Sequence, residues 1–192
     1  MAVRTVGCLL FWLICSGIAI SAEQYTLDAA HSDLSFQVRN FASAVTGKFT
    51  DFSGTVTFDR RQPERSGVDA TIQVQSIDTG IKDRDHHLLS AEFFDVQKFP
   101  TITFRSTSVE RTSERVAEVH GNLTMHGTTR AVLLHVELLP DDSNNAAESM
   151  RWKVTANLKR KSFGLGWNAL IEASQAVGDD ISIRMKIVTP AR

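Results

Sequence analysis

The chain has 192 residues, of which 42% are hydrophobic, and its formal net charge is −1 at pH 7. Arg4 is the only charged residue among the first 22, so the 21 basic residues of the whole chain leave 20 beyond that point, against 22 acidic ones. This balance provides no basic field, and we expect no binding to nucleic acid or to an anionic membrane surface.

The first 22 residues have the pattern of a secretory signal peptide. Arg4 gives a positive start, an apolar run extends from Val6 to Ile20, and small residues end the segment at Ala22. The run is too short to cross a bilayer comfortably, which favours cleavage after Ala22 over a retained membrane anchor. We therefore expect a signal peptide at 1–22, export to a bacterial periplasm, and a processed protein that does not span the membrane.

Both cysteines, Cys8 and Cys15, lie in this first segment. We therefore expect residues 23–192 to hold no disulfide and to carry out no thiol chemistry. A cysteine-free exported domain suits the periplasm better than a disulfide-rich extracellular module does. The segment 23–192 is the right length for one domain and contains no fixed-period repeat or long linker.

Alternation of apolar and polar residues dominates this domain and predicts β-strands. After a short strand at 25–27, eight longer segments have this pattern: 33–39, 47–58, 70–75, 102–109, 119–126, 132–138, 151–158 and 181–187. About eight strands joined by short turns are typical of an antiparallel sandwich or barrel, and closure would remove exposed strand edges. A barrel of this size is either filled by side chains or holds one small ligand, and periodicity does not decide between them.

One stretch, near residues 83–97, interrupts the strand pattern. Asp83 and Ser90 are residues that commonly begin helices, and the apolar side chains of Phe93 and Phe94 follow at helical spacing from earlier leucines. The sequence therefore predicts a short, apolar helical insertion between two strands. Such an insertion is well placed to line or gate an apolar interior.

A polar cluster, Asp83 to His87, opens this stretch. Histidine and carboxylate are metal-ligand types, but adjacent histidines on a helix point about 100° apart. We therefore favour a structural network, in which Arg84 pairs with a carboxylate and Asp85 orients a turn, over a metal site. Contact with a ligand headgroup is the remaining alternative.

The other histidines have simple interpretations. His31 lies beside Ser32, but the chain contains no Gly-x-Ser-x-Gly elbow, so we expect His31 to fix the start of the barrel by hydrogen bonding. His120, His126 and His135 lie on polar strand faces, where solvated surface histidines are the default and an incidental metal site is the alternative.

Short motifs occur in a fixed order from residue 25 to about 189. They are Asp28–Ser32, Val45–Phe49, Phe52–Gly54, Ser76–Thr79, Arg84–Leu88, Glu92–Val96, Phe99–Thr107, Gly121–Gly127, Arg160–Gly164 and Val177–Asp179. No single motif is strong, but the ordered set resembles the polyisoprenoid-binding, YceI-like family of bacterial periplasmic proteins. The chain departs from that family at Asn40, where many members have a histidine.

The resemblance implies an all-β fold, a lipocalin-like extended antiparallel β-barrel. It also implies that a long hydrophobic cavity binds an isoprenoid or similar amphipathic lipid, and that a homodimer forms, since dimers are common in the family. The expected cavity wall consists of strand residues that point inward on the register above, joined by Phe93 and Phe94 of the insertion and by Trp167. The full set is Phe36, Val38, Phe49, Phe58, Ile72, Val74, Phe93, Phe94, Ile102, Phe104, Leu123, Met125, Leu134, Trp152, Trp167 and Met185.

We therefore expect a binding protein that carries, stores or sequesters a lipid such as an isoprenoid quinone or a polyprenol. It needs no catalytic residue, no cofactor and no metal. The expected polar network or headgroup contact consists of His31, Arg84, Asp85 and His86. Two alternatives stay open: an enzyme or redox accessory that acts on the lipid through His31, Asp85 and His86, and a filled barrel with a protein-interaction role.

Overall fold

The computed structural model describes residues 22–40, 43–140, 149–167, 173–174 and 177–189. The expected signal peptide, apart from Ala22, lies outside these residues. Among them, no helix is both long and apolar enough to cross a membrane.

The described residues form one antiparallel sheet of eleven strands. In chain order the strands are β1 (Glu23–Thr26), β2 (Asp33–Asn40), β3 (Ser43–Phe49), β4 (Phe52–Phe58), β5 (Gly67–Gln73), β6 (Ile77–Asp78), β7 (Thr101–Arg111), β8 (Val116–Met125), β9 (Thr128–Leu138), β10 (Met150–Lys159) and β11 (Val177–Thr189). Their order across the sheet is β1-β4-β5-β7-β8-β9-β10-β11-β2-β3-β6.

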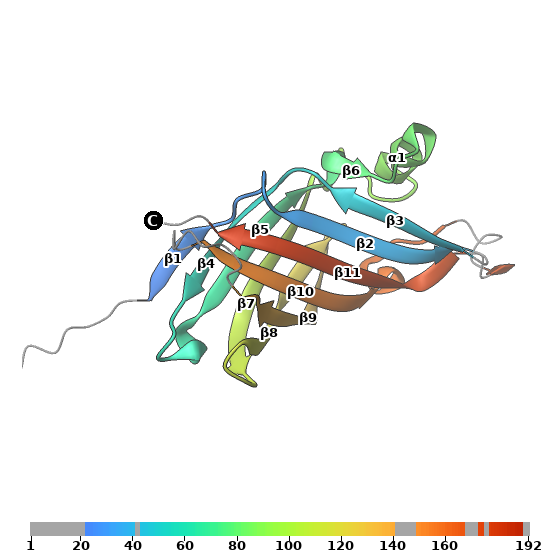
Figure 1. Ribbon diagram of the computed structural model, residues 1–192. Coiled ribbons are helices and arrows are strands. Elements are labelled where there is room, and N and C mark those ends of the chain that lie inside the picture. The colour runs from blue at the N-terminus through green and yellow to red at the C-terminus, as the bar shows by residue number, and fades with distance from the viewer. Residues whose placement is uncertain (1–21, 41–42, 141–148, 168–172, 175–176, 190–192) are drawn as a thin grey trace, which may run out of the picture.

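The sheet curls round so that its strands enclose an interior (Figure 1). Two features bring together strands that are far apart in the order of the sheet. First, β3 and β4 lie near opposite ends of the strand order, yet only Thr50 and Asp51 separate them in the chain. Second, the Asp28 amide, just after β1, donates a hydrogen bond to the Val188 carbonyl of β11 at 2.9 Å. The predicted barrel-like, antiparallel all-β fold is confirmed.

The predicted strand count of about eight was too low. The expected single strand at 47–58 is two strands, because the chain turns a corner at Thr50 and Asp51 and β3 and β4 pair with different neighbours. The two-residue strand β6 was also missed. Two residues are too few to show an alternating pattern, and β6 is defined by its pairing with Lys48 and Phe49.

The predicted helical insertion is present but only its first half is helical. Helix α1 spans Lys82–Leu89, and Ser90 ends this helix instead of beginning a second one. The Ser90 amide and hydroxyl both donate to the His87 carbonyl. Turns follow the helix. They are stabilised by the amides of Lys98 and Phe99, which both donate to the Asp95 carbonyl at 2.9 Å.

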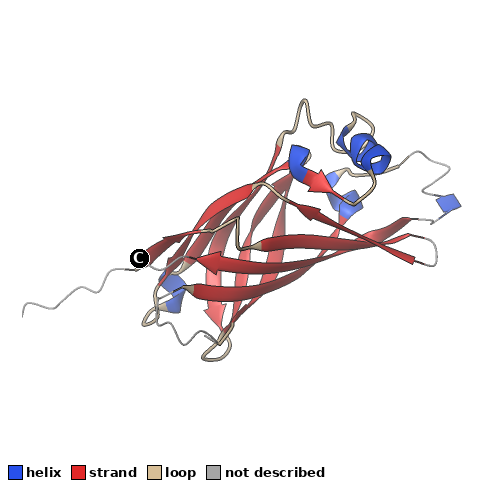
Figure 2. Cartoon of the chain, turned by 45° about the horizontal axis from the view of Figure 1, so that its top comes forward, coloured by secondary structure: helices blue, strands red, loops and turns tan. Residues whose placement is uncertain are grey.

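The described residues also include three short 3-10 turns: η1 (Pro63–Arg65), η2 (Val74–Ser76) and η3 (Arg160–Phe163). Figure 2 shows η1 at one end of the barrel, whereas α1 and other short helical turns gather at the other end. We call the end with α1 the helical end. The end with η1 and the β7–β8 hairpin is called the loop end.

Candidate binding cavity

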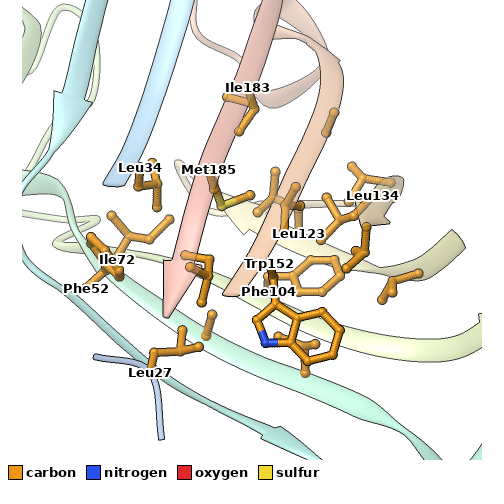
Figure 3. Close-up of a pocket in the computed structure, with 18 of the residues that line it drawn as sticks. Leu27, Leu34, Phe52, Ile72, Phe104, Leu123, Leu134, Trp152, Ile183 and Met185 are labelled. Atoms are coloured by element: carbon orange, nitrogen blue, oxygen red, sulfur yellow. The ribbon is translucent and has the colours of Figure 1, made fainter. Parts of the chain in front are cut away.

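An elongated cavity of about 1120 Å³ lies inside the curled sheet. Pockets for small molecules usually measure about 300–1,000 Å³, so this one has room for a long ligand. In Figure 3 the labelled side chains converge on this space from strands all round the sheet, among them Leu34 of β2, Phe104 of β7 and Trp152 of β10. The barrel's own side chains therefore leave its interior unfilled.

The sequence-predicted wall residues lie around this cavity with one exception. All of the apolar residues expected at the wall line it apart from Val74. Strand β5 ends at Gln73, and Val74 begins turn η2, where it is 1% exposed within the core. The alternating register therefore stops one residue before Val74. Contact between the lining residues and a ligand stays a prediction.

Aromatic rings pack together in the wall at the helical end of the cavity. Phe93 packs against Trp167 with ring centroids 4.7 Å apart, and the edge of Phe94 meets Phe93 at 5.2 Å. Phe94 also contacts Phe49 of β3, with centroids 6.4 Å apart. All four rings line the cavity, so the insertion forms part of its wall as predicted.

Polar and charged residues surround the loop end of the cavity. They come from the loop after β4, from the β7–β8 hairpin and from the start of β10: Asp59, Arg60, Ser66, Arg111, Ser113, Glu114, Arg115, Ser149 and Arg151. The cavity thus has a largely apolar interior and a polar rim at the loop end. Such a space suits a molecule with a long apolar chain.

Asp59 organises part of this rim. Its Oδ1 accepts hydrogen bonds from the amides of Arg61 and Gln62, both at 2.9 Å. These bonds, that from Gln62 above all, hold the pKa of Asp59 below its usual range because they stabilise the charged form. The charged carboxylate in turn fixes the turn that leads into η1.

The expected polar network exists around α1, but its centre is Thr79. Arg84 was predicted to pair with a carboxylate; instead its Nε donates to Thr79 Oγ1 and its Nη2 to the Thr79 carbonyl, both at 2.7 Å. Asp85 Oδ1 accepts from the Thr79 amide at 2.9 Å and from the Thr79 hydroxyl. Asp85 therefore orients a turn, as predicted, and Thr79 and Arg84 are the members of this network that line the cavity.

The two candidate histidines lie away from the cavity wall. His31 is on the turn between β1 and β2, where its Nδ1 is 2.7 Å from Asp28 Oδ2. This hydrogen bond is the main reason why the pKa of Asp28 lies below its usual range. His86 is exposed on α1. Neither histidine lines the cavity, and neither does Asp85, so the structure does not gather these three groups there.

Arg160 is a cavity-lining residue that sequence reasoning did not select. It is 1% exposed, and its guanidinium donates to the carbonyls of Leu165, Gly178 and Val177 at 2.8, 2.9 and 3.2 Å. It therefore ties η3 to the start of β11. An arginine in a basic, Gly-rich segment is normally a surface residue, so the residue pattern gave no sign that Arg160 is buried. The sequence pointed to it only as part of the Arg160–Gly164 motif.

Comparisons with known proteins agree with this architecture. A family model described as the YceI-like domain matches residues 25–189. Protein YceI of Salmonella newport (strain SL254) is 37% identical over 175 residues, which cover 89% of this chain and 90% of that protein.

Solved structures resemble the fold as well. Burkholderia cenocepacia BcnA has a TM-score of 0.76 and 25% identity, covering 84% of this chain and 98% of BcnA. A polyisoprenoid binding domain from Saccharophagus degradans, implicated in plant cell wall breakdown, has a TM-score of 0.65 and 18% identity, covering 88% of this chain and 98% of that domain. The family match and the sequence identity together show that this chain belongs to the YceI-like family.

Proposed function

We propose that this protein binds an isoprenoid or similar amphipathic lipid and holds its chain inside the cavity, as a carrier, store or sequestering protein. The observation that carries this proposal is the elongated, apolar-walled cavity of about 1120 Å³. The name of the Saccharophagus degradans domain, which is called polyisoprenoid binding, supports the same ligand class.

The expected affinity follows from burial of the lipid chain. Each buried methylene contributes about 0.8 kcal/mol. Association costs an estimated 4–15 kcal/mol in lost freedom, so a five-carbon unit that gains roughly 4 kcal/mol does not bind stably on its own. A chain of several isoprene units exceeds that cost. The apolar wall therefore favours long chains with little selection among headgroups.

A binding role without catalysis fits the site better than an enzyme does. The alternative of an enzyme or redox accessory requires His31, Asp85 and His86 to reach the lipid, and none of them lines the cavity. Of these expected polar residues only Arg84 lines it, and its guanidinium already bonds to Thr79 at the helical end, so we assign the headgroup to the polar loop end of the cavity. We extend the proposal to a periplasmic location after removal of residues 1–22 and to a homodimer.

Tryptophan fluorescence gives a direct test. Trp152 and Trp167 are the only tryptophans in residues 23–192, and both line the cavity. Titration of this segment with a long-chain polyprenol is expected to change their emission and to saturate at one lipid per chain. An emission spectrum unchanged by the polyprenol, in a protein whose circular dichroism shows intact sheet, would count against the proposal.

A further inference from the structure

A group of three metal-ligating side chains lies on the outer face of the sheet, away from the lipid cavity. Glu110 belongs to β7, and Glu118 and His120 belong to β8. Their neighbours Val109 and Val119 line the cavity, so the alternation of a strand directs the three polar side chains to the opposite face. The sequence favoured a solvated surface histidine at position 120, with an incidental metal site as the alternative, and did not pair it with Glu110 or Glu118.

Strand register brings these residues together. Glu110 is directly opposite Glu118 in the β7–β8 pair, and His120 is two residues further along the same face of β8. One ligand atom from each of the three side chains lies within 4.8 Å of the other two. His120 Nε2 is already 3.7 Å from Glu110 Oε1.

These distances suit a common metal ion. Zinc binds imidazole nitrogen and carboxylate oxygen at about 2.0–2.2 Å, so two ligands of one tetrahedral ion are roughly 3–4 Å apart. Small side-chain rotations therefore suffice to place all three ligand atoms round one ion, and the strands need not move. One imidazole with two carboxylates favours Zn²⁺, Cu²⁺ or Ni²⁺ over Ca²⁺ and Mg²⁺, which prefer oxygen ligands alone.

The two facing carboxylates, of Glu110 and Glu118, also favour binding of a cation. Like charges that face each other across an antiparallel pair destabilise it. Within the described part of the chain, the ion pairs give Glu110 only His120 as a partner and give Glu118 none. A divalent ion between the two carboxylates would replace this repulsion with attraction.

We propose that Glu110, Glu118 and His120 form a binding site for a divalent transition metal of the zinc type. His135 of β9 is opposite Glu118 on its other side, one strand away, and is the nearest register position for a fourth ligand. The site requires no lipid and is independent of the proposed lipid-binding function.

The site lies beside the turn of the β7–β8 hairpin. Glu110 immediately precedes, and Glu118 closely follows, a segment that lines the loop end of the cavity through Arg111, Glu114 and Arg115. In Figure 1 this hairpin extends at the end of the barrel away from α1. A metal ion held by both strands would therefore stiffen one side of the cavity's polar rim.

Isothermal titration of the chelator-treated protein with Zn²⁺ tests this site. The expected result is one Zn²⁺ per chain. Glu110→Gln and His120→Gln should each lower the affinity by at least about tenfold, because even changes to groups that merely orient a ligand cost about 10–100-fold.

His87→Gln is the matched control, since His87 also pairs with a glutamate, Glu92, at 3.0 Å but belongs to no group of three metal-ligating side chains among the residues that the structure describes. This variant should keep the wild-type affinity. Circular dichroism checks that each variant is folded.

Hydrogen exchange locates the ion independently of the variants. Zn²⁺ should slow amide exchange within 109–121 and leave α1 unchanged. The proposal is overturned if the wild-type protein takes up no Zn²⁺, if the Glu110 and His120 variants bind it as tightly as wild type, or if protection appears at α1 instead.

Discussion

Two glycines lie beneath aromatic rings of the cavity wall. A Cβ atom at Gly121 would come within 2.4 Å of Phe104 Cζ, and one at Gly47 would come equally close to Phe36 Cζ. Real Cβ atoms do not approach other atoms so closely, so each ring occupies space that any other residue would fill. The absence of a side chain at these positions therefore sets where Phe36 and Phe104 lie.

Replacement of Gly121 by alanine should therefore displace the Phe104 ring. Overpacking of this kind costs about 1–3 kcal/mol of unfolding free energy, which urea denaturation would measure. Gly178→Ala is a suitable control, since its nearest contact would be a looser 3.2 Å to Arg39 Cβ. Equal destabilisation by the two substitutions would contradict this account of Gly121.

Asp59, at the rim of the cavity, should make the stability of the folded protein depend on pH. Because hydrogen bonds from backbone amides lower its pKa in the folded state, its contribution to stability is present at neutral pH. This contribution declines as the pH falls below the usual carboxyl pKa of about 3.9 and through the lower folded value. Asp59→Asn should therefore be less stable than wild type at pH 7, and urea unfolding should show the difference shrinking at pH 3. A difference of the same size at both pH values would argue against a role for the charge.

At the scale of elements, the insertion after β6 places Phe93 and Phe94 in the wall at the helical end of the cavity. Phe94→Glu would place a charge in an apolar wall, so we expect it to abolish lipid binding in the fluorescence titration while the sheet signal in circular dichroism survives. Phe99→Glu is the control from the same segment, because Phe99 packs on His126 and does not line the cavity. Retention of lipid binding by the Phe94 variant would rule out an essential role for this ring.

The strand pattern predicted most of the fold and of the cavity wall, because alternation is a local property of the sequence. Trp152, Val154 and Ala156 alternate along β10, and the structure buries all three. The errors in the strand count are places where a residue's position depends on a partner distant in the chain. The corner between β3 and β4 and the short strand β6 are both defined by pairing.

Side-chain partners were harder to predict than strands. Arg84 bonds to Thr79 because a turn brings the two residues together, and this turn is not visible in the residue pattern. Arg160 is buried because it reaches backbone carbonyls near the start of β11. The Glu110, Glu118 and His120 group depends on the exact pairing of β7 with β8. The last of these requires strand register, which alternation alone does not supply, and the first two depend on turn geometry that is not visible in it either.

At the scale of the whole molecule, a long apolar cavity predicts a dependence on chain length. If burial of hydrocarbon drives binding, each added methylene contributes about 0.8 kcal/mol, or roughly a fourfold gain in affinity, until the cavity is full. Fluorescence titration with prenyl alcohols of increasing length would measure this slope. Affinities independent of chain length would show that the apolar wall does not provide the binding energy.

The most direct test of lipid binding is native mass spectrometry of residues 23–192 purified without detergent, followed by organic extraction of whatever is bound. We expect a stoichiometric adduct that extracts as a prenyl or acyl chain, and the same spectrum would test the proposed homodimer. A ligand-free mass that stays unchanged after incubation with octaprenyl compounds would contradict the proposed function.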